Sequence, residues 1–414
     1  MAWGSSMEGS CPFIVTRIVL RGPGNAGERL PMMLRRSTRV PIASAMNWAL
    51  SMLRPSLAST TMERYLRHLA LFHWWIEVER LPLDNPLAFL DAFTPSLIEA
   101  GLRPWLGKDM SSRRVAKLAV NPEEIRERLT VVSKYVDWLL LAAQRNLSVR
   151  TEAPQFLAVE KTRLSIKNTF DWLMPTGTAS SERLGLTRGE VTRLLEVIHP
   201  QSPENPWGRG GSEKMLALRA RNELAARLML AFGPRRGDLL KMHTADVKTH
   251  GGEPTLWVKR RPDDPKDPRI WEPNAKTQER MLPLAPSLAR MLDNYIQKSR
   301  PLIPSHKKSP YLFLAGSGRP LSARAFNDIF AALTPTIPAF HPHRLRHTHN
   351  DRLLLYCKKN GISEKEMVQH AKYLNGWSGD NTGAYTKRSV REAARNVSLG
   401  VQHDLFEPIE DIPY

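Results

Sequence analysis

Apolar residues recur every three or four positions through much of residues 39–172, and this spacing predicts amphipathic α-helices. The stripes consist of large aliphatic and aromatic side chains. They fall at Ala45, Trp48 and Met52, at Tyr65, Leu69, Phe72 and Ile76, and at Ile125, Leu129, Val132, Val136 and Leu139. Pro122 and the two glutamates after it suit a helix start, because acidic side chains complement the helix dipole there. We therefore predict that residues 39–172 form a helical domain.

The segments on either side of this domain have other patterns. Residues 1–38 contain one strand-like apolar run, 13–20, followed by a glycine-rich loop and a basic stretch. A small β segment and a flexible arm both fit this pattern. Residues 173–185 include Pro175-Thr-Gly-Thr-Ala-Ser-Ser181, a composition typical of a connecting segment. We predict an interdomain linker at 173–185.

Residues 186–395 mix helical and strand-like patterns. Thr187 and Glu190 form the sequence of a capping box ahead of an apolar stripe. The runs 255–259 and 279–284 read as two strands joined by a long polar excursion. This predicts a second domain that is mainly helical with a small antiparallel β-sheet. A tail, 396–414, follows and becomes acidic and proline-bearing.

Charge narrows the class of partner. The formal net charge is +19, which favours a polyanion such as nucleic acid, because neutralising phosphates releases condensed counterions. No apolar run approaches the length of a membrane span, and no stretch reads as a signal peptide. The two cysteines, Cys11 and Cys357, form no disulfide framework, so we expect a reducing cytoplasm.

The densest cluster of reactive side chains is the stretch His341-Pro-His-Arg-Leu-Arg-His-Thr-His349. His343 and Arg346 are three residues apart, so on a helix they share one face. An arginine fork beside a histidine suits a phosphate that is gripped while protons move nearby. The histidines lack the cysteine or carboxylate partners of a zinc site, so we predict no metal.

Three boxes of sequence occur in order along the C-terminal half of the chain. The first two are Gly233-Pro-Arg235-Arg-Gly-Asp238-Leu239 and His343-Arg-Leu-Arg-His-Thr348. They resemble the first and second motif boxes of the tyrosine recombinase (phage integrase) family, which has glutamate in place of Asp238. Leu374-Asn-Gly-Trp377, followed by Thr382-Gly-Ala-Tyr385, resembles the closing box, although its gap to the tyrosine is one residue shorter than usual. The resemblance is close in the C-terminal half and holds only in outline in the N-terminal half.

The resemblance implies a set of site residues. Those it marks as catalytic are Arg235, Lys276, His343, Arg346, Trp377 and Tyr385, with Tyr385 as nucleophile and with Asp238 and His347 in support. Asp238 would pair with an arginine or cap a helix. Basic residues of the helical domain, Arg64, Arg67, Arg113, Arg114 and Lys117, are expected to touch DNA phosphates.

Other residues compete for three of these places. Lys276 precedes the second strand at nearly the family's lysine position, and Lys259 and Lys266 are the alternatives because the hairpin is longer than usual. Arg236 is the rival of Arg235. Tyr356 and Tyr373 are rivals of Tyr385.

The implied activity is DNA strand cleavage and rejoining through a 3′-phosphotyrosyl intermediate, without metal, ATP or other cofactor. The implied architecture is a two-domain DNA clamp, with a helical core-binding domain ahead of the catalytic domain. We expect double-stranded DNA as partner, a homodimer or homotetramer on it, accessory DNA-bending or directionality proteins, and a role in a mobile element of a bacterial cytoplasm. A type IB topoisomerase and a DNA-binding relative without activity are the alternative interpretations.

Overall fold

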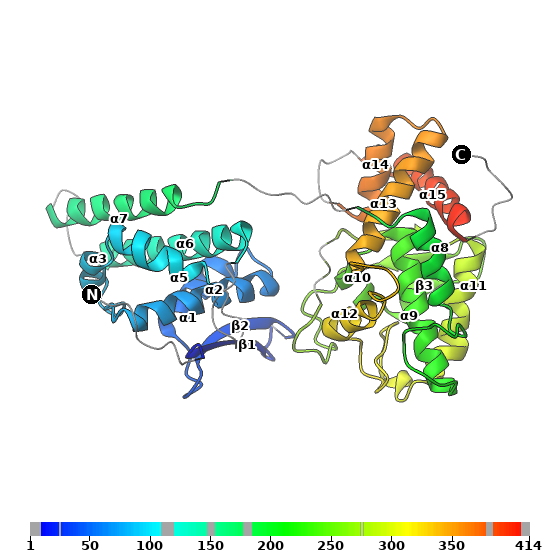
Figure 1. Ribbon diagram of the computed structural model, residues 1–414, viewed down its shortest axis with the longest axis horizontal. Coiled ribbons are helices and arrows are strands. Elements are labelled where there is room, and N and C mark those ends of the chain that lie inside the picture. Colours follow the sequence, from blue (N-terminus) through cyan, green and yellow to red (C-terminus); the bar gives the residue numbers. More distant parts are fainter. Residues whose placement is uncertain are drawn as a thin grey trace. The chain divides into compact units, whose positions relative to one another are not determined.

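The computed structural model describes residues 10–24, 26–108, 120–146, 154–176, 184–273, 275, 277–377 and 384–406. Two compact units make up the chain: the first comprises residues 1–20 and 29–181, the second residues 21–28 and 182–414, so the main boundary falls after Ser181. That position lies inside the linker predicted at 173–185. Both units are mainly helical, and each has a small antiparallel sheet in its described part (Figure 1). The predicted fold class, mainly α with a small antiparallel sheet beside the site, is confirmed.

A β-hairpin begins the first unit. β1 (Phe13–Val19) pairs antiparallel with β2 (Arg29–Arg35), and Phe13 lies opposite Arg35. The side chains of Phe13, Leu30 and Met33 are buried in the core of the helical unit, against α2. Of the two possibilities for residues 1–38, the described strands at 13–19 and 29–35 thus show a small β segment. A separate segment ending at residue 38 is wrong, because the hairpin shares its core with the helices.

Helices form the rest of the first unit. Its α-helices are α1 (Ala43–Trp48), α2 (Ser59–Val78), α3 (Pro86–Ala92), α4 (Pro95–Leu97), α5 (Arg103–Leu106), α6 (Pro122–Asn146) and α7 (Pro154–Trp172), with π-helical turns at Ala49–Leu53 and Ile98–Leu102. Buried aromatic rings dominate the contacts between these helices, among them Trp48, Phe72, Phe93 and Tyr135. Most of the predicted stripe residues are therefore in the core of this unit, but Met52 is 52% exposed.

The second unit holds the three sequence boxes. Its α-helices are α8 (Arg188–Val197), α9 (Glu213–Phe232), α10 (Arg236–Leu240), α11 (Pro286–Asn294), α12 (Ala323–Ala331), α13 (Pro342–Lys359), α14 (Glu364–Asn375) and α15 (Ala384–Phe406). A π-helical turn follows α11 at Tyr295–Ser299, and short 3₁₀ turns lie at Thr244–Asp246, Arg300–Leu302 and His306–Lys308. α13 packs along the central helix α9, and both α13 and α14 pack on α15 (Figure 1).

The sheet of this unit contains the two predicted strands and one more. β3 (Val247–Lys248), β4 (Thr255–Val258) and β5 (Arg280–Pro283) form an antiparallel sheet in the order β3-β4-β5. Thr255 lies opposite Pro283 and Val258 opposite Arg280. Leu256 and Leu282 are buried, so one face of this sheet covers the core.

The tail predicted to start at residue 396 is not a separate segment at its beginning. α15 continues through residue 406, and Ala394, Val397, Val401 and Leu405 are buried along one face of it. Gln402 is fully buried and accepts a hydrogen bond from the backbone N–H of Ala285 at 2.9 Å. The helix is thereby anchored in the core of the second unit.

Within the described part of the chain, no helix combines the length and the apolar character that crossing a bilayer requires.

Candidate active site

The first arginine of the site follows a tight helix end. α9 ends at Gly233, whose φ of 55° lies in the left-handed region that favours glycine. A Cβ at this position would also lie 2.8 Å from the ring of His349, so glycine is required twice over. Pro234 comes next, and Arg235 then starts α10 as its N-cap residue. The Gly-Pro pair therefore fixes where the backbone of Arg235 lies.

Asp238 caps the helix that Arg235 begins. Its Oδ2 accepts a hydrogen bond from the backbone N–H of Arg235 at 3.0 Å, and its side chain is buried. Its Oδ1 is also buried and has no hydrogen-bond partner among the described residues. Of the two roles expected from the sequence, the structure shows capping. The rival Arg236 is exposed and donates instead to Asn327 Oδ1 at 2.8 Å.

The second arginine, Arg346, reaches the same turn from α13. Its side chain is 4% exposed, and its Nη1 donates to the carbonyl of Gly233. This carbonyl belongs to the C-terminal end of α9, where the helix dipole favours a positive charge. Nη2 of Arg346 is buried and has no hydrogen-bond partner in the described part of the chain. Arg346 thus joins the first and second sequence boxes.

The start of α13 is held on the other side by its neighbour, Arg344. Arg344 donates to Glu190 at 3.1 Å, and Glu190 also completes the predicted capping box of α8 with Thr187. The hydroxyl of Thr348 accepts a hydrogen bond from the backbone N–H of Leu186 at 2.7 Å. These contacts fix the helix that presents Arg346.

Three histidines of the same helix lie in different environments. His343 is exposed, and its ring meets that of half-buried His347 edge to face, with centroids 4.7 Å apart. His349 is fully buried against the end of α9. Burial, with the charge of Arg346 second, lowers the pKa of His349 to about 3, so it stays neutral at physiological pH. His343 is therefore placed to meet a ligand, whereas His349 is a packing residue.

A third arginine of the site was not foreseen from the sequence. Arg280 opens β5 and is 4% exposed. Its Nε donates to the carbonyl of Leu374 at 2.7 Å, and its Nη1 donates to Thr277 Oγ1 at 2.9 Å and to the carbonyl of Gln278 at 3.1 Å. The signal that was available is a charged residue at the start of an otherwise apolar strand. Such a residue often faces solvent, so the signal is weak.

Trp377 follows directly after this contact. α14 ends at Gly376 with a φ of 61°, and the backbone N–H of Trp377 bonds back to the carbonyl of Lys372 at 3.0 Å. The indole is 38% exposed, so it remains accessible at the surface. Asn375 Nδ2 also donates to Asn350 Oδ1 at 2.9 Å, which ties α14 to α13.

We call Arg235, Arg280 and Arg346, together with Asp238, the guanidinium cluster. Burial lowers the pKa of Arg346 to about 10, and the charges of Arg235 and Arg280 act in the same direction. Burial also lowers the pKa of Arg280 to about 10, where Asp238 opposes the effect and Arg235 adds to it. Three positive charges thus face one carboxylate in a mostly buried place. Such an excess favours binding of an anion.

Two of the predicted catalytic residues are described incompletely or not at all. Lys276 lies outside the described residues. Tyr385 is the second residue of α15, and its side chain lies outside the described part. Both rival tyrosines have structural contacts. The hydroxyl of Tyr373 donates to the carbonyl of Met281 at 3.0 Å, and the ring of Tyr356 lies against Gly400 of α15.

Most of the predicted site residues lie within an interval that matches a known family, and Tyr385 lies two residues beyond its end. Residues 211–383 match the sequence model described as the Phage integrase family. This interval contains Arg235, the β4–β5 hairpin, Arg346 and Trp377. The interval 211–383 is therefore a phage integrase family domain. No curated protein is similar enough in sequence to count as a match.

Solved structures of integrases and recombinases show a distant likeness. One is the XerH site-specific recombinase bound to palindromic difH substrate in a post-cleavage complex. It has 16% sequence identity and a TM-score of 0.36, over 66% of this chain and 80% of that one. Another is the Tn1549 transposon integrase in complex with a circular intermediate DNA. It has 15% identity and a TM-score of 0.39, over 68% of this chain and 89% of that one. Family membership rests on the sequence match.

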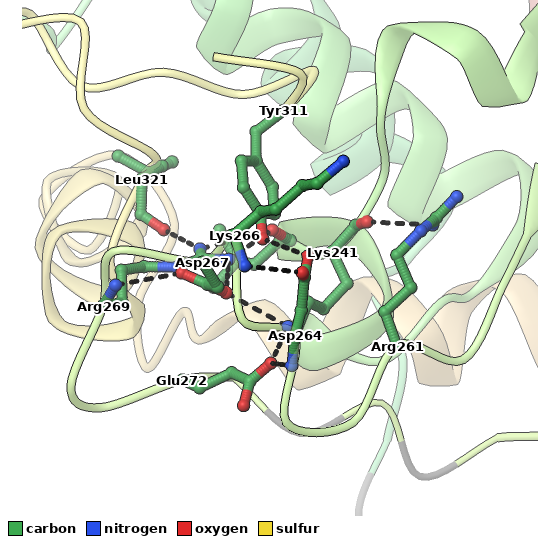
Figure 2. Close-up of polar contacts among 10 residues, drawn as sticks. Lys241, Arg261, Asp264, Lys266, Asp267, Arg269, Glu272, Tyr311 and Leu321 are labelled. Carbon is green, nitrogen blue, oxygen red and sulfur yellow. Dashed lines mark hydrogen bonds and ion pairs between the residues drawn. The ribbon is translucent and has the colours of Figure 1, made fainter. Parts of the chain in front are cut away.

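Residues 259–273, between β4 and β5, form the long polar segment that we call the excursion. This segment is folded around buried charges (Figure 2). Lys241, at the end of α10, is 1% exposed; it pairs with Asp267 at 3.0 Å and also with Glu272. Arg269 pairs with Asp267 at 2.7 Å and lies over the ring of Tyr311 at 4.6 Å. The polar pattern of this segment therefore encodes a fixed structure.

The electrostatics of the excursion hold Asp267 ionised. Burial raises the pKa of Asp267, but its hydrogen bond with Arg269 and the charges of Arg269 and Lys241 outweigh this and hold the pKa at about 2. Tyr311 donates to Asp264 Oδ2 at 3.1 Å, and Arg261 pairs with Asp246 at 2.6 Å. Lys266, one of the alternatives to Lys276, is exposed on this segment, whereas Lys259 lies over the ring of Trp257 at 4.2 Å.

The expected DNA contacts of the first unit are only partly described. Arg64 and Arg67 are 56% and 61% exposed, and each pairs with a glutamate, Glu127 and Glu63 respectively. Arg113, Arg114 and Lys117 lie outside the described residues. The described histidines and acids offer one group with metal-ligand spacing, His68, Glu124 and Glu127, and it lies in this unit. Its two glutamates are already paired with Arg64 and Arg128.

Proposed function

We propose that this family member is a site-specific recombinase or integrase that cleaves and rejoins DNA strands through a phosphotyrosine at Tyr385. The observation that carries the proposal is the guanidinium cluster. In this cluster the Nη2 atoms of Arg280 and Arg346 are buried and have no hydrogen-bond partner among the described residues. Asp238 is the one carboxylate of the cluster that opposes the three positive charges. Buried cations are normally paired, so an unneutralised group of them is suited to a bound phosphate.

The chemistry assigned to these residues balances without an external energy source. The hydroxyl oxygen of Tyr385 attacks the phosphorus, and the bond to the 5′ oxygen breaks. His343 takes the tyrosine proton, and Lys276 gives a proton to the leaving 5′ oxygen. The phosphotyrosyl ester conserves the energy of the broken bond, so rejoining is the same step in reverse.

The remaining residues stabilise the charge that develops on the phosphate. Arg235 and Arg346 would each donate to the non-bridging oxygens, and each such donor contributes about 3 kcal/mol to the transition state. Trp377 can add one indole N–H but cannot transfer a proton. Asp238 and His347 orient the two arginines and His343. Two fixed guanidiniums replace the charge that a divalent ion would supply.

The substrate we propose is double-stranded DNA, with a second copy of the chain supplying the partner site. The net charge of +19 supports a polyanionic partner. The helical unit ahead of the boxes favours recombination over the relaxation of a type IB topoisomerase, because the resemblance implies a core-binding domain there. An inactive relative is disfavoured, since every reactive residue type of the family is present in the sequence.

A nicked suicide substrate tests this proposal directly, because it traps the covalent protein–DNA adduct. We expect the full chain to form the adduct in the presence of EDTA. Tyr385→Phe should form none while binding DNA with nearly unchanged affinity, since one hydroxyl adds little to a salt-dominated interface. Tyr373→Phe, a matched control in a rival tyrosine, should retain the adduct. A persistent adduct in Tyr385→Phe would place the nucleophile elsewhere, and absence of any wild-type adduct would favour the inactive relative.

A further inference from the structure

Arg280 makes three hydrogen bonds that join two distant segments of the chain. Its acceptors are the carbonyl of Leu374, at the end of α14, and Thr277 Oγ1 and the carbonyl of Gln278, just before β5. None of these acceptors is a carboxylate. The side chain is 4% exposed, so the charge is desolvated without an ion pair in the described part of the chain. Burying a charge without an ion pair costs free energy, which suggests that the geometry fixed by Arg280 has a use.

The two segments also fit each other closely. The backbone N–H of Gln278 donates to the carbonyl of Gly376 at 3.0 Å. A Cβ on Gly376 would lie 2.5 Å from Nη1 of Arg280 and 2.9 Å from Thr277, so even one methyl group does not fit. We call Arg280, Thr277, Gln278, Leu374 and Gly376 the β5–α14 latch.

We propose that Arg280 is a positioning residue that fixes Trp377 at the edge of the guanidinium cluster through the β5–α14 latch. Trp377 is bonded covalently to Gly376, so any movement of the latch displaces the indole. The inference rests on the proposed function, which assigns Trp377 and the cluster to phosphate. Arg280 contributes its charge to the cluster, and the inference adds that its hydrogen bonds position Trp377.

A guanidinium suits this task better than an ammonium. Arg280 uses two of its nitrogens in fixed directions to reach three acceptors on two segments. Lysine carries the same charge on a single, freely rotating group, so it cannot reproduce the planar fork. Arg280→Lys therefore separates the loss of geometry from the loss of charge.

The matched control is Arg300, another buried arginine of the second unit that donates to backbone carbonyls. It is 7% exposed and donates to the carbonyls of Ser309 at 2.6 Å and Tyr311 at 2.9 Å, and none of its acceptors among the described residues belongs to the latch. Burial lowers the pKa of Arg300, as it does for Arg280. Arg300→Lys should therefore disturb packing to a similar degree without moving Trp377.

The first experiment observes Trp377 without any DNA. The full chain is labelled with 5-fluorotryptophan, and Trp377→Phe identifies the ¹⁹F signal of Trp377 among those of the 11 tryptophans. Arg280→Lys and Thr277→Val should both shift or broaden this signal, whereas Arg300→Lys should leave it in place. An unmoved Trp377 signal in folded Arg280→Lys overturns the inference. If Arg280→Lys does not fold, an unmoved signal in Thr277→Val does the same.

The second experiment measures cleavage on the suicide substrate. Arg280→Lys should slow adduct formation by on the order of a hundredfold, because a displacement of about 1 Å has this cost in a preorganised site. DNA affinity should stay within about twofold, and Arg300→Lys should cleave as the wild type does. Cleavage of Arg280→Lys at the wild-type rate overturns the inference. If the wild type forms no adduct, the proposed function fails instead, while the ¹⁹F result still reports on the latch.

Discussion

The excursion and the guanidinium cluster both bury charge, but only the excursion neutralises it. Lys241 is 1% exposed and Arg346 is 4% exposed, so the two cations are desolvated to a similar degree. Lys241 has two carboxylate partners, Asp267 and Glu272, whereas Arg346 donates to a backbone carbonyl and leaves Nη2 unused among the described residues.

This difference separates two uses of buried charge. A paired cation stabilises the fold as it stands, and removing one partner leaves the other charge buried and alone. An unpaired cation gains most when an anion from outside arrives, so its contribution appears in binding and in the transition state. The charges of the excursion are therefore structural, and we propose that those of the cluster serve to bind a ligand.

The largest expected effect is on the structural side. Lys241→Met should lower the free energy of unfolding by about 3–5 kcal/mol, because Asp267 and Glu272 would both lose the buried cation between them. Urea denaturation of the full chain measures this change. The control is Lys266→Met on the exposed part of the same segment, which should change the unfolding free energy by less than about 0.5 kcal/mol. A Lys241→Met variant as stable as the wild type would break the comparison.

The next effect is on the functional side. Arg346→Met should slow adduct formation at least about a hundredfold, or about 2.7 kcal/mol, through lost stabilisation of the phosphate charge. Its unfolding free energy should fall by less than about 1 kcal/mol, because removing one of three neighbouring guanidiniums relieves repulsion. Arg344→Met loses the ion pair with Glu190, so its unfolding free energy should fall more than that of Arg346→Met. Its rate of adduct formation should stay close to that of the wild type. Equal losses of stability in Arg346→Met and Lys241→Met would contradict the distinction.

A smaller effect should appear when an anion is added to the free protein. Sulfate at ten times its dissociation constant should raise the unfolding free energy by about 1.4 kcal/mol if it occupies the cluster. Thermal melting in sodium sulfate is compared with melting in sodium chloride of equal ionic strength. Sulfate also stabilises folded proteins in general, and the gain measured in Arg346→Met gives the size of this general effect. Identical gains in the wild type and in Arg346→Met would show that the cluster binds no anion.

The smallest effect concerns the histidine behind the cluster. The pKa of His349 is about 3 in the folded chain, below its ordinary value near 6.5. The unfolded chain therefore binds more protons between these values, and stability falls as the pH drops through about 6.5. Between pH 7 and pH 5.5 the wild type should lose about 1 kcal/mol more than His349→Leu. A pH-independent difference between the two would mean that His349 has the same pKa in the folded and unfolded chain.

The parts of this molecule that could be predicted from sequence are those encoded by neighbouring residues. Thr187 and Glu190 form their capping box because the two partners lie one helical turn apart. The runs around β4 and β5 could be recognised as strands, and the Gly-Pro break placed Arg235 at a helix start. The boxes were readable because the roles of Arg235 and Arg346 depend on backbone turns that local sequence specifies.

The parts that could not be predicted depend on distant partners. Arg280 is buried only because α14 ends against it, a contact between residues 94 positions apart. The polar residues of the excursion resembled those of a solvated loop. Nothing near Asp267 in the sequence indicates that Lys241 forms an ion pair with it. The extent of α15 was missed for the same reason, since the burial of Val397 and Val401 is decided by helices far away in sequence.

The C-terminal half of α15 is fixed in the core, and the N-terminal end of the same helix carries residue 385. Each residue of an α-helix turns the chain by about 100° and advances it by about 1.5 Å. Because Val397, Val401 and Leu405 hold one face of the helix in the core, the angular position of the Tyr385 backbone is set from 12 residues away. Deleting one residue between 386 and 396 would swing that position by about 100° around the helix axis without changing a single residue of the three boxes.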